Sequence, residues 1–373
     1  MTATLLELLR STADRAGSDL HLTAGAPPLV RERGELRPLG DHPPLTPAAT
    51  RELVYSRLSA AQRARHEQGE EVDLSFGIAG LARFRCNVFR QRGAVAAVYR
   101  LVPERIPSFD ELDLPPIVRT LTGLANGLVL VTGPTGSGKS TTLAALVDTI
   151  NTQRRGHILT IEDPIEFVHA HKRSIVNQRE IHTDCASFGS ALRAALREDP
   201  DVVLIGEMRD RETMEVALRI AETGHLTLAT LHTGSAVQTI NRVVDMFPAG
   251  QQQQVRSQLA AVLEGLVCQT LVPAADGAGR VAAAEVMVAT PAIRNLIRDG
   301  KNQQVYSMLQ TGQDRLGMQT MNQSLAALVG QGRIALAAAL ARSSNRDELQ
   351  EIVRRSRAAG RPWPAPGAPG RAR

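Results

Sequence analysis

The chain has 373 residues, of which 43% are hydrophobic and 22% are charged, so we expect two or three domains, each with its own apolar core. Its 43 basic and 38 acidic residues give a net charge of only +5, and aromatic residues make up 3%. A surface that binds single-stranded nucleic acid needs aromatic side chains along a basic groove. We therefore expect no direct contact with nucleic acid.

Cysteines and apolar segments indicate the compartment. Cys86, Cys185 and Cys268 lie far apart and form no C-x-x-C pair, which predicts neither a disulfide framework nor a cysteine zinc site. Residues 1–15 carry acidic side chains among their leucines, a pattern that favours a helix over a signal peptide. No apolar run reaches the roughly 18 residues that cross a bilayer. We expect a cytoplasmic protein that contacts a membrane only through a partner.

The N-terminal part of the chain predicts a mixed α+β domain. Residues 4–16 have leucines at helical spacing, and Thr46 followed by Pro47 is typical of a helix start. Alternating or apolar runs predict strands at 19–22, 29–36, 72–76, 82–88 and 94–101.

One predicted strand, at 82–88, has two different faces. Phe84, Cys86 and Val88 share one face, and Arg83, Arg85 and Asn87 share the other. The arginine-bearing face is either a solvated surface or a surface that meets a phosphate at a subunit boundary. The pattern alone favours neither interpretation.

A cluster of prolines between residues 103 and 116 indicates a domain boundary. Beyond it, buried strands at 128–132, 158–162, 202–206 and 226–231 alternate with helices, which predicts a parallel sheet wrapped by helices. The chain becomes mostly helical after residue 251, with Val255, Leu259, Val262, Leu263 and Leu266 at helical spacing. We expect an N-terminal domain at 1–102, a linker at 103–116, a second domain at 117–359 and a disordered tail at 360–373.

A phosphate-binding loop is the most specific signal in the chain. Residues 133–141 match G-x-x-x-x-G-K-[ST] between a predicted strand and a predicted helix, the context that this motif requires. Backbone N–H groups and the helix N-terminus would bind phosphates, Lys139 would bridge the terminal phosphates, and the Ser140 hydroxyl would bind Mg²⁺. The loop residues are Gly133, Pro134, Thr135, Gly136, Ser137, Gly138, Lys139, Ser140 and Thr141.

Carboxylates follow two of the predicted strands. Glu207 comes after the strand at 202–206, and Glu162, Asp163 and Glu166 come after the strand at 158–162. Ligand sites in parallel sheets lie outside the carboxyl ends of the strands, so these acids should converge on the phosphate loop. One of them could orient or deprotonate a water that attacks phosphorus. The alternative is a set of ordinary strand-end caps.

Two histidines, His225 and His232, flank the predicted strand at 226–231. A neutral imidazole there could contact the γ-phosphate or connect neighbouring subunits. An ordinary, partly buried histidine is the equally weighted alternative. Metal ligation is not expected, because no third soft ligand follows at a suitable spacing.

Taken together, these motifs resemble those of the type II/IV secretion ATPases. The resemblance covers residues 5–335 and includes an acidic box at 159–169, the segment 196–201 leading into 206–210, and a histidine box at 224–233. It implies a homohexamer whose subunits join a PAS-like α+β domain to a RecA-like α/β ATPase domain with C-terminal helices. ATP and Mg²⁺ are the implied cofactors.

The resemblance also implies residue roles. Glu166 would be the catalytic base and Glu207 the Mg²⁺-associated carboxylate, while His225 and His232 would lie near the γ-phosphate. The arginine fingers of the family come from the N-terminal domain, where Arg85 and Arg100 are the candidates.

Residues 292–299 nearly match a helix of the pilus-retraction branch of this family, with Asp299 in place of the usual glutamate. This branch implies pilus disassembly through an inner-membrane platform protein, with a possible retraction ATPase paralogue as a further partner. An accessory paralogue, a non-hydrolysing ATP-gated scaffold and a DNA-translocating ATPase are the alternatives. On its own, the segment predicts an amphipathic helix with Ile293, Leu296 and Ile297 inward and Arg294 and Arg298 together one turn apart.

Overall fold

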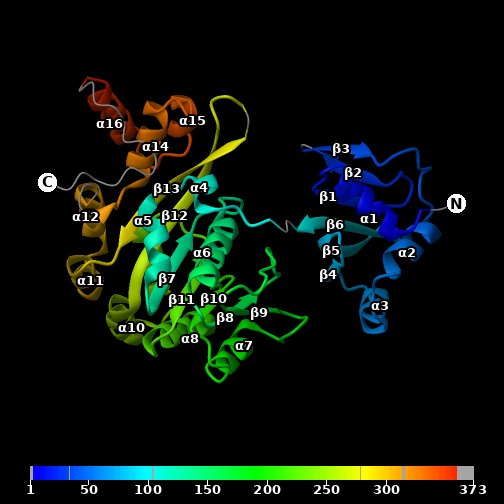
Figure 1. The fold of residues 1–373 in the computed structure, drawn as a ribbon, viewed down its shortest axis with the longest axis horizontal. Helices are drawn as coiled ribbons and strands as arrows, with labels where there is room; N and C mark the ends of the chain where they lie inside the picture. Colours follow the sequence, from blue (N-terminus) through cyan, green and yellow to red (C-terminus); the bar gives the residue numbers. More distant parts are fainter. Residues whose placement is uncertain (1–2, 33, 103–104, 278, 313–315, 359–373) are drawn as a thin grey trace. The chain divides into compact units, whose positions relative to one another are not determined.

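The computed structural model describes residues 3–32, 34–102, 105–277, 279–312 and 316–358 (Figure 1). The chain divides into two compact units, Met1–Arg105 and Ile106–Arg373. The tail predicted at 360–373 lies outside the described residues. Within the described ranges, no helix is both long enough and apolar enough to cross a bilayer.

The N-terminal unit contains an antiparallel sheet of six strands in the order β3-β2-β1-β6-β5-β4. Its core includes Leu8, Leu9, Phe84 and Tyr99. The strands are β1 (Asp19–Leu22), β2 (Leu29–Glu32), β3 (Glu35–Pro38), β4 (Val72–Ile78), β5 (Ala82–Gln91) and β6 (Ala94–Val102). The helices are α1 (Leu5–Asp14), α2 (Pro47–Tyr55) and α3 (Ala60–Glu67).

Local sequence explains where these helices begin. Thr4 and Glu7 form a capping box on α1, in which each side chain accepts a hydrogen bond from the other residue's backbone N–H. Thr46 caps α2 and Pro47 takes its first position, so the predicted helix start is confirmed.

Phe84 and Cys86 on β5 are buried whereas Arg85 is exposed, which confirms the predicted division of this strand into two faces.

The second unit contains a sheet of seven strands in the order β13-β12-β7-β11-β10-β8-β9, in which all neighbours are parallel except β12 and β13. The strands are β7 (Gly127–Thr132), β8 (His157–Glu162), β9 (Ile175–Glu180), β10 (Val202–Ile205), β11 (Leu226–Leu231), β12 (Leu263–Pro273) and β13 (Arg280–Val288). The α-helices up to the end of the sheet are α4 (Phe109–Leu112), α5 (Pro116–Thr120), α6 (Lys139–Gln153), α7 (Phe188–Ala195), α8 (Arg211–Glu222), α9 (Ala236–Asp245) and α10 (Ala249–Val262), with a 3₁₀ turn at Leu121–Gly123. After it come α11 (Pro291–Arg298), a 3₁₀ turn at Asn302–Gln304, α12 (Val305–Thr311), α14 (Met321–Gly330), α15 (Leu336–Leu340) and α16 (Arg346–Ala358).

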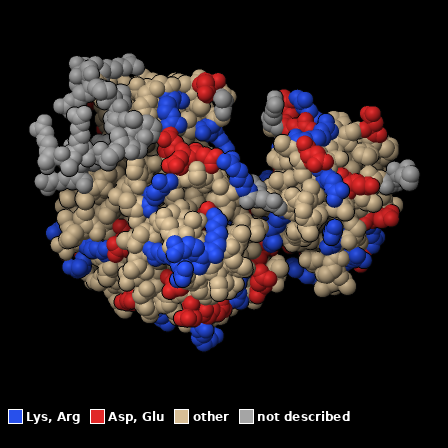
Figure 2. All heavy atoms as spheres, viewed as in Figure 1, with Lys and Arg blue, Asp and Glu red and all other residues tan. Residues whose placement is uncertain are grey.

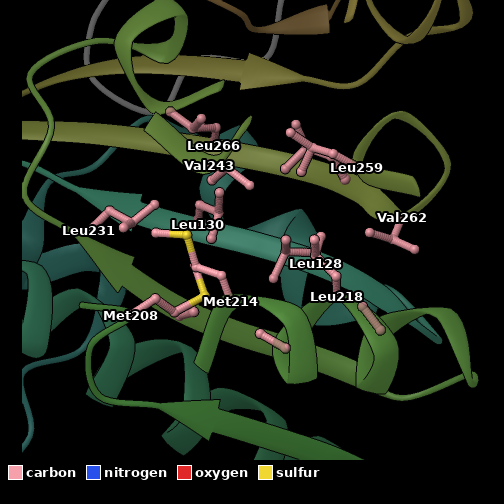
Figure 3. Packing of buried hydrophobic residues seen from close by; sticks show 14 of the residues in the cluster. Leu128, Leu130, Met208, Met214, Leu218, Leu231, Val243, Leu259, Val262 and Leu266 are labelled. Carbon is pink, nitrogen blue, oxygen red and sulfur yellow. The ribbon is translucent and has the colours of Figure 1, made fainter. Parts of the chain in front are cut away.

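Both faces of this sheet are buried. On β7, Leu128 and Leu130 belong to one hydrophobic cluster, and Val129 and Val131 belong to another on the opposite face. Figure 3 shows Leu128 and Leu130 among side chains that include Met214 of α8. Burial on two faces explains why the parallel strands are continuously apolar rather than alternating. The expected α/β fold is confirmed.

Two sequence expectations need correction. The helix expected beyond residue 251 ends at Val262, and Leu263 and Leu266 belong to β12. Their segment pairs with both β7 and β13, so burial within the sheet overrides the helical spacing of its leucines. The stretch 106–116, expected as part of a linker, belongs to the second unit, because Phe109 and Leu114 are buried in its core.

A buried carboxylate connects the sheet to the C-terminal helices. Glu285 on β13 is 3% exposed. Its Oε1 accepts a hydrogen bond from the N–H of Ala236, at the start of α9 (2.7 Å), and its Oε2 accepts one from the N–H of Met321, at the start of α14 (3.4 Å). Burial raises the pKa of Glu285, although both N–H groups act to lower it. Two helix N-termini therefore share one carboxylate, a charge that suits their dipoles.

Charged side chains of both signs share the surface (Figure 2), in agreement with the small net charge of the chain. Basic and acidic side chains both occur across the face of the second unit shown in Figure 2. Cys86 and Cys268 are buried, and Cys185 is only partly buried. Burial raises the pKa of all three thiols, to about 12 for Cys86.

Candidate active site

The phosphate loop lies between the end of β7 at Thr132 and the start of α6 at Lys139. Gly133, Gly136 and Gly138 have φ angles of 142°, 76° and 92°, a region that side chains disfavour. A Cβ on Gly133 would also lie 2.3 Å from the carbonyl oxygen of Gln269 on β12. The backbone of the turn therefore favours glycine at all three positions, and the close approach of β12 requires it at Gly133 as well.

The N-terminus of α6 is open to an anion. Gly138 provides no side-chain cap, so the first backbone N–H groups of the helix are available to a ligand. Ser137 is 3% exposed, and its Oγ has no hydrogen-bond partner among the described residues. A buried hydroxyl without a partner is costly, and a phosphate oxygen in the loop would supply one. The loop therefore fits a nucleotide.

Lys139 is folded back onto the loop. The side chain is 9% exposed, and its Nζ donates hydrogen bonds to the carbonyl oxygens of Gly133 (2.9 Å) and Pro134 (3.1 Å). Burial lowers the pKa of Lys139, while the charges of Glu207 and Glu166 act to raise it. Both predicted functional carboxylates therefore act on the loop lysine.

The carboxyl ends of β8, β10 and β11 meet at the same edge of the sheet as the loop, because these strands run parallel to β7. Glu207 follows β10, and its two oxygens bind different side chains: Oε2 lies 2.8 Å from Nη2 of Arg209, and Oε1 lies 3.1 Å from Nε2 of His232. Burial raises the pKa of Glu207, but Arg209 and His232 together lower it below its ordinary value. Glu207 is therefore an ionised carboxylate with charged or polar partners.

The acids after β8 divide into different roles. Glu162 accepts hydrogen bonds from the Thr160 hydroxyl (2.6 Å), the Gln178 amide (3.2 Å) and the backbone N–H of Glu166 (3.4 Å). Burial raises the pKa of Glu162. Glu166 and Asp163 are exposed. Glu162 is thus held by its neighbours, and the expected convergence with the phosphate loop rests on Glu166 and Glu207.

The two histidines lie at opposite edges of the sheet. His232 follows β11, beside Glu207. His225 precedes β11; its carbonyl oxygen binds the N–H of Gly127 at the start of β7, and its Nδ1 contacts Thr223 Oγ1 (3.1 Å). The six residues of β11 separate the histidines by about 20 Å. The expectation that both lie near the γ-phosphate is therefore wrong for His225 within this unit.

The arginine candidates lie opposite each other on β5 and β6 of the N-terminal unit. Nε of Arg100 binds Oδ1 of Asp19 at 2.8 Å, and Asp19 is 4% exposed. Arg85 is exposed and has no hydrogen-bond or ion-pair partner among the described residues. The geometry thus separates the two candidates: Arg100 is held by a buried carboxylate, and Arg85 is free to bind a ligand.

The segment at 292–299 forms α11, with Ile293 and Ile297 buried. Arg294 does not act together with Arg298: its Nη2 binds Glu264 Oε1 at 2.6 Å, and its Nη1 donates to the last carbonyls of α10. Arg298 is exposed. The first arginine therefore fastens α11 to the end of α10, a role that its spacing did not indicate.

One polar residue at the site had no predicted role. Arg209 lies two positions after Glu207 and contacts it directly. The signal in the sequence was a basic residue close behind the strand-end glutamate, but in a loop the spacing does not determine where a side chain points.

Known proteins resemble this arrangement over most of the chain. Residues 108–352 match the model of the type II/IV secretion system protein family. The chain is 51% identical over 331 residues to the type IV pilus retraction ATPase PilT of Pseudomonas aeruginosa, covering 89% of this chain and 95% of that protein. It is 41% identical over 348 residues to the type IV pilus ATPase PilU of the same organism, covering 93% and 91%.

A solved structure gives the same result. The crystal structure of the pilus retraction motor PilT with bound ADP superposes with a TM-score of 0.89 and 52% sequence identity, over 94% of this chain and 100% of that chain. The resemblance that the motifs indicated is confirmed, and the chain belongs to the family of type II/IV secretion system ATPases.

Proposed function

We propose that the chain is an ATP-hydrolysing motor that powers type IV pilus retraction by disassembling the filament. The family supports ATP hydrolysis, and the identity to PilT, which exceeds that to PilU, favours a principal retraction motor. The observation that carries the proposal is the phosphate loop itself, where Ser137 Oγ is buried without a partner among the described residues and Nζ of Lys139 is folded onto the carbonyl oxygens of Gly133 and Pro134.

The residues near the phosphate loop would have different roles in the reaction. Lys139 and the N–H groups of the loop would bind the terminal phosphates. The Ser140 hydroxyl and the Glu207 carboxylate would hold Mg²⁺, which fits an ion that takes oxygen ligands and keeps several waters. Bound Mg²⁺ would supply charge that balances the γ-phosphate oxygens. Glu166, which is exposed, would orient or deprotonate the attacking water.

Assembly would complete the site. Arg85, the unpartnered arginine, would contact phosphate across a subunit boundary in a homohexamer, and such a finger is worth roughly 10³–10⁵ in rate in other phosphoryl-transfer enzymes. The motor would act in the cytoplasm, at the inner membrane, through a pilus platform protein. A retraction ATPase paralogue is a further proposed partner.

The test is steady-state ATP hydrolysis across protein concentration, with nucleotide binding measured in parallel. We expect native turnover to rise as the protein assembles. Glu166→Gln should lose about 10²–10⁴-fold in turnover while still binding ATP, and Arg85→Ala should lose far more turnover than binding. A native protein that binds ATP without turnover at any concentration would instead indicate an accessory paralogue or a scaffold.

A further inference from the structure

The carboxylate proposed to bind Mg²⁺ already has a positive partner in this structure. Nη2 of Arg209 lies 2.8 Å from Oε2 of Glu207, within charge-assisted hydrogen-bond distance. The Glu207 side chain is 20% exposed and the Arg209 side chain is 62% exposed. The anion is therefore fixed in the site, whereas its partner extends from solvent and can leave it.

The contact is electrostatically matched on both sides. The hydrogen bond to Glu207 raises the pKa of Arg209 above its ordinary value, and the same contact helps to lower the pKa of Glu207. A guanidinium and a hydrated Mg²⁺ are alternative ways to neutralise one carboxylate. Both cannot take the same oxygen at full strength, because their like charges repel at short distance.

We propose that Arg209 is a positioning residue that occupies the cation position at Glu207 until Mg²⁺ and nucleotide displace it. This inference rests on the proposed function, in which Glu207 is the Mg²⁺-associated carboxylate. In the absence of the ion, the contact with Arg209 holds the Glu207 carboxylate in place at the loop edge. When the ion binds, Arg209 is released.

The size of the effect follows from exposure. Exposed ion pairs typically contribute a few tenths to one kcal/mol, because water screens them. Removing the competing cation should therefore lower the Mg²⁺ concentration needed at the site by about two- to fivefold. A residue that merely contacted phosphate would act in the opposite direction, because its loss would weaken nucleotide binding at every Mg²⁺ concentration.

The experiment measures binding of a fluorescent, non-hydrolysable ATP analogue to the full chain as Mg²⁺ is titrated from excess chelator upward. We expect Arg209→Gln to shift the Mg²⁺ midpoint to about two- to fivefold lower concentration and to leave affinity in chelator unchanged. Arg209→Lys should lie near the native midpoint. A midpoint that is unchanged or higher in Arg209→Gln would overturn the proposal.

A matched control and a double variant separate this inference from the proposed function. Arg219 is also exposed and also paired, with Glu215 on α8 at 3.5 Å, so Arg219→Gln should keep the native midpoint. Glu207→Gln should weaken the Mg²⁺ dependence, and adding Arg209→Gln should then change nothing further. If Glu207→Gln keeps the native Mg²⁺ dependence, the proposed metal role fails. If Glu207→Gln loses the Mg²⁺ dependence while Arg209→Gln alone has no effect, the proposed metal role of Glu207 stands and only the proposed role of Arg209 at the cation position fails.

Discussion

Glu207 and Glu285 are carboxylates on the same sheet in opposite situations. Glu207 lies at the loop edge, partly exposed, with the side chains of Arg209 and His232 as partners and a lowered pKa. Glu285 lies on β13, fully enclosed, with backbone N–H groups as partners and a raised pKa. Side-chain partners can exchange for a metal ion or a phosphate, whereas backbone partners at two helix ends cannot move without the helices.

The comparison teaches that burial alone does not identify a functional acid in this fold. Glu285 is the more buried of the two, yet its partners are backbone N–H groups at two helix starts, which belong to the fold and leave no place for a ligand. The partners of Glu207 are side chains, which can move away when a ligand binds. We therefore expect changes at Glu207 to appear in catalysis and changes at Glu285 to appear in stability.

The same chemical change at both positions gives the largest expected difference. Glu207→Gln should reduce ATP turnover by about 10²-fold or more, because it removes the charge that balances the metal. Glu285→Gln should leave turnover within a factor of about 5, the equivalent of 1 kcal/mol. Steady-state hydrolysis by the assembled protein checks both, with melting temperatures as the folding control. Equal losses in the two variants would remove the distinction.

Truncation of Glu285 should give the next largest effect. Glu285→Ala leaves the N–H groups of Ala236 and Met321 buried without an acceptor, which should cost about 2–4 kcal/mol of stability and lower the melting temperature by several degrees. Glu285→Gln should recover part of this loss, because its amide oxygen still accepts one N–H. Calorimetric melting of the three proteins is the measurement, and an unchanged melting temperature in Glu285→Ala would contradict the structural role.

Asp19 in the N-terminal unit is an intermediate case: a buried carboxylate that binds an exposed arginine. Burial raises its pKa, but Ser18 and Arg100 lower it to below the ordinary value of 3.8. A depressed pKa in the folded state stabilises the protein above pH 3.8 and ceases to do so as the pH falls through the folded-state value. Arg100 is 65% exposed, so this pair should contribute about 1 kcal/mol or less.

The pH dependence of unfolding tests this smallest effect. The difference in melting temperature between the native chain and Arg100→Ala should be constant near neutral pH and should shrink below pH 3.8. A difference that stays constant in acid would mean that Arg100 stabilises the unit by packing rather than by charge.

The sequence was sufficient to predict those features that depend only on neighbouring residues. The phosphate loop, the capped starts of α1 and α2, and the four apolar strands from β7 to β11 other than β9 are all local patterns, and the structure contains them. The strand β12 was missed because its leucines continue the helical spacing of α10, and only pairing with β7 and β13 makes it a strand.

The site was less predictable because side-chain partners are set by tertiary contacts. His225 and His232 look equivalent in sequence, but a strand places them at opposite edges of the sheet. Arg85 and Arg100 also look equivalent, and only the register between β1 and β6, which brings Asp19 opposite Arg100, separates them. The spacing of Arg209 and Glu207 left their contact open, because loop conformation decides where the side chains point. Glu285 had no sequence signal for its partners, because these lie in other segments.

The uneven burial of the cysteines makes the native chain suitable for site-selective labelling. Cys86 and Cys268 are buried thiols, so a maleimide dye should react first at Cys185, slowly, because burial raises the pKa of this thiol too. Cys185 contacts the carbonyl oxygen of Glu180, whose carboxylate accepts the N–H of Ile165, the residue before Glu166. A single dye at this position would therefore report movements of the acidic loop without any engineered cysteine.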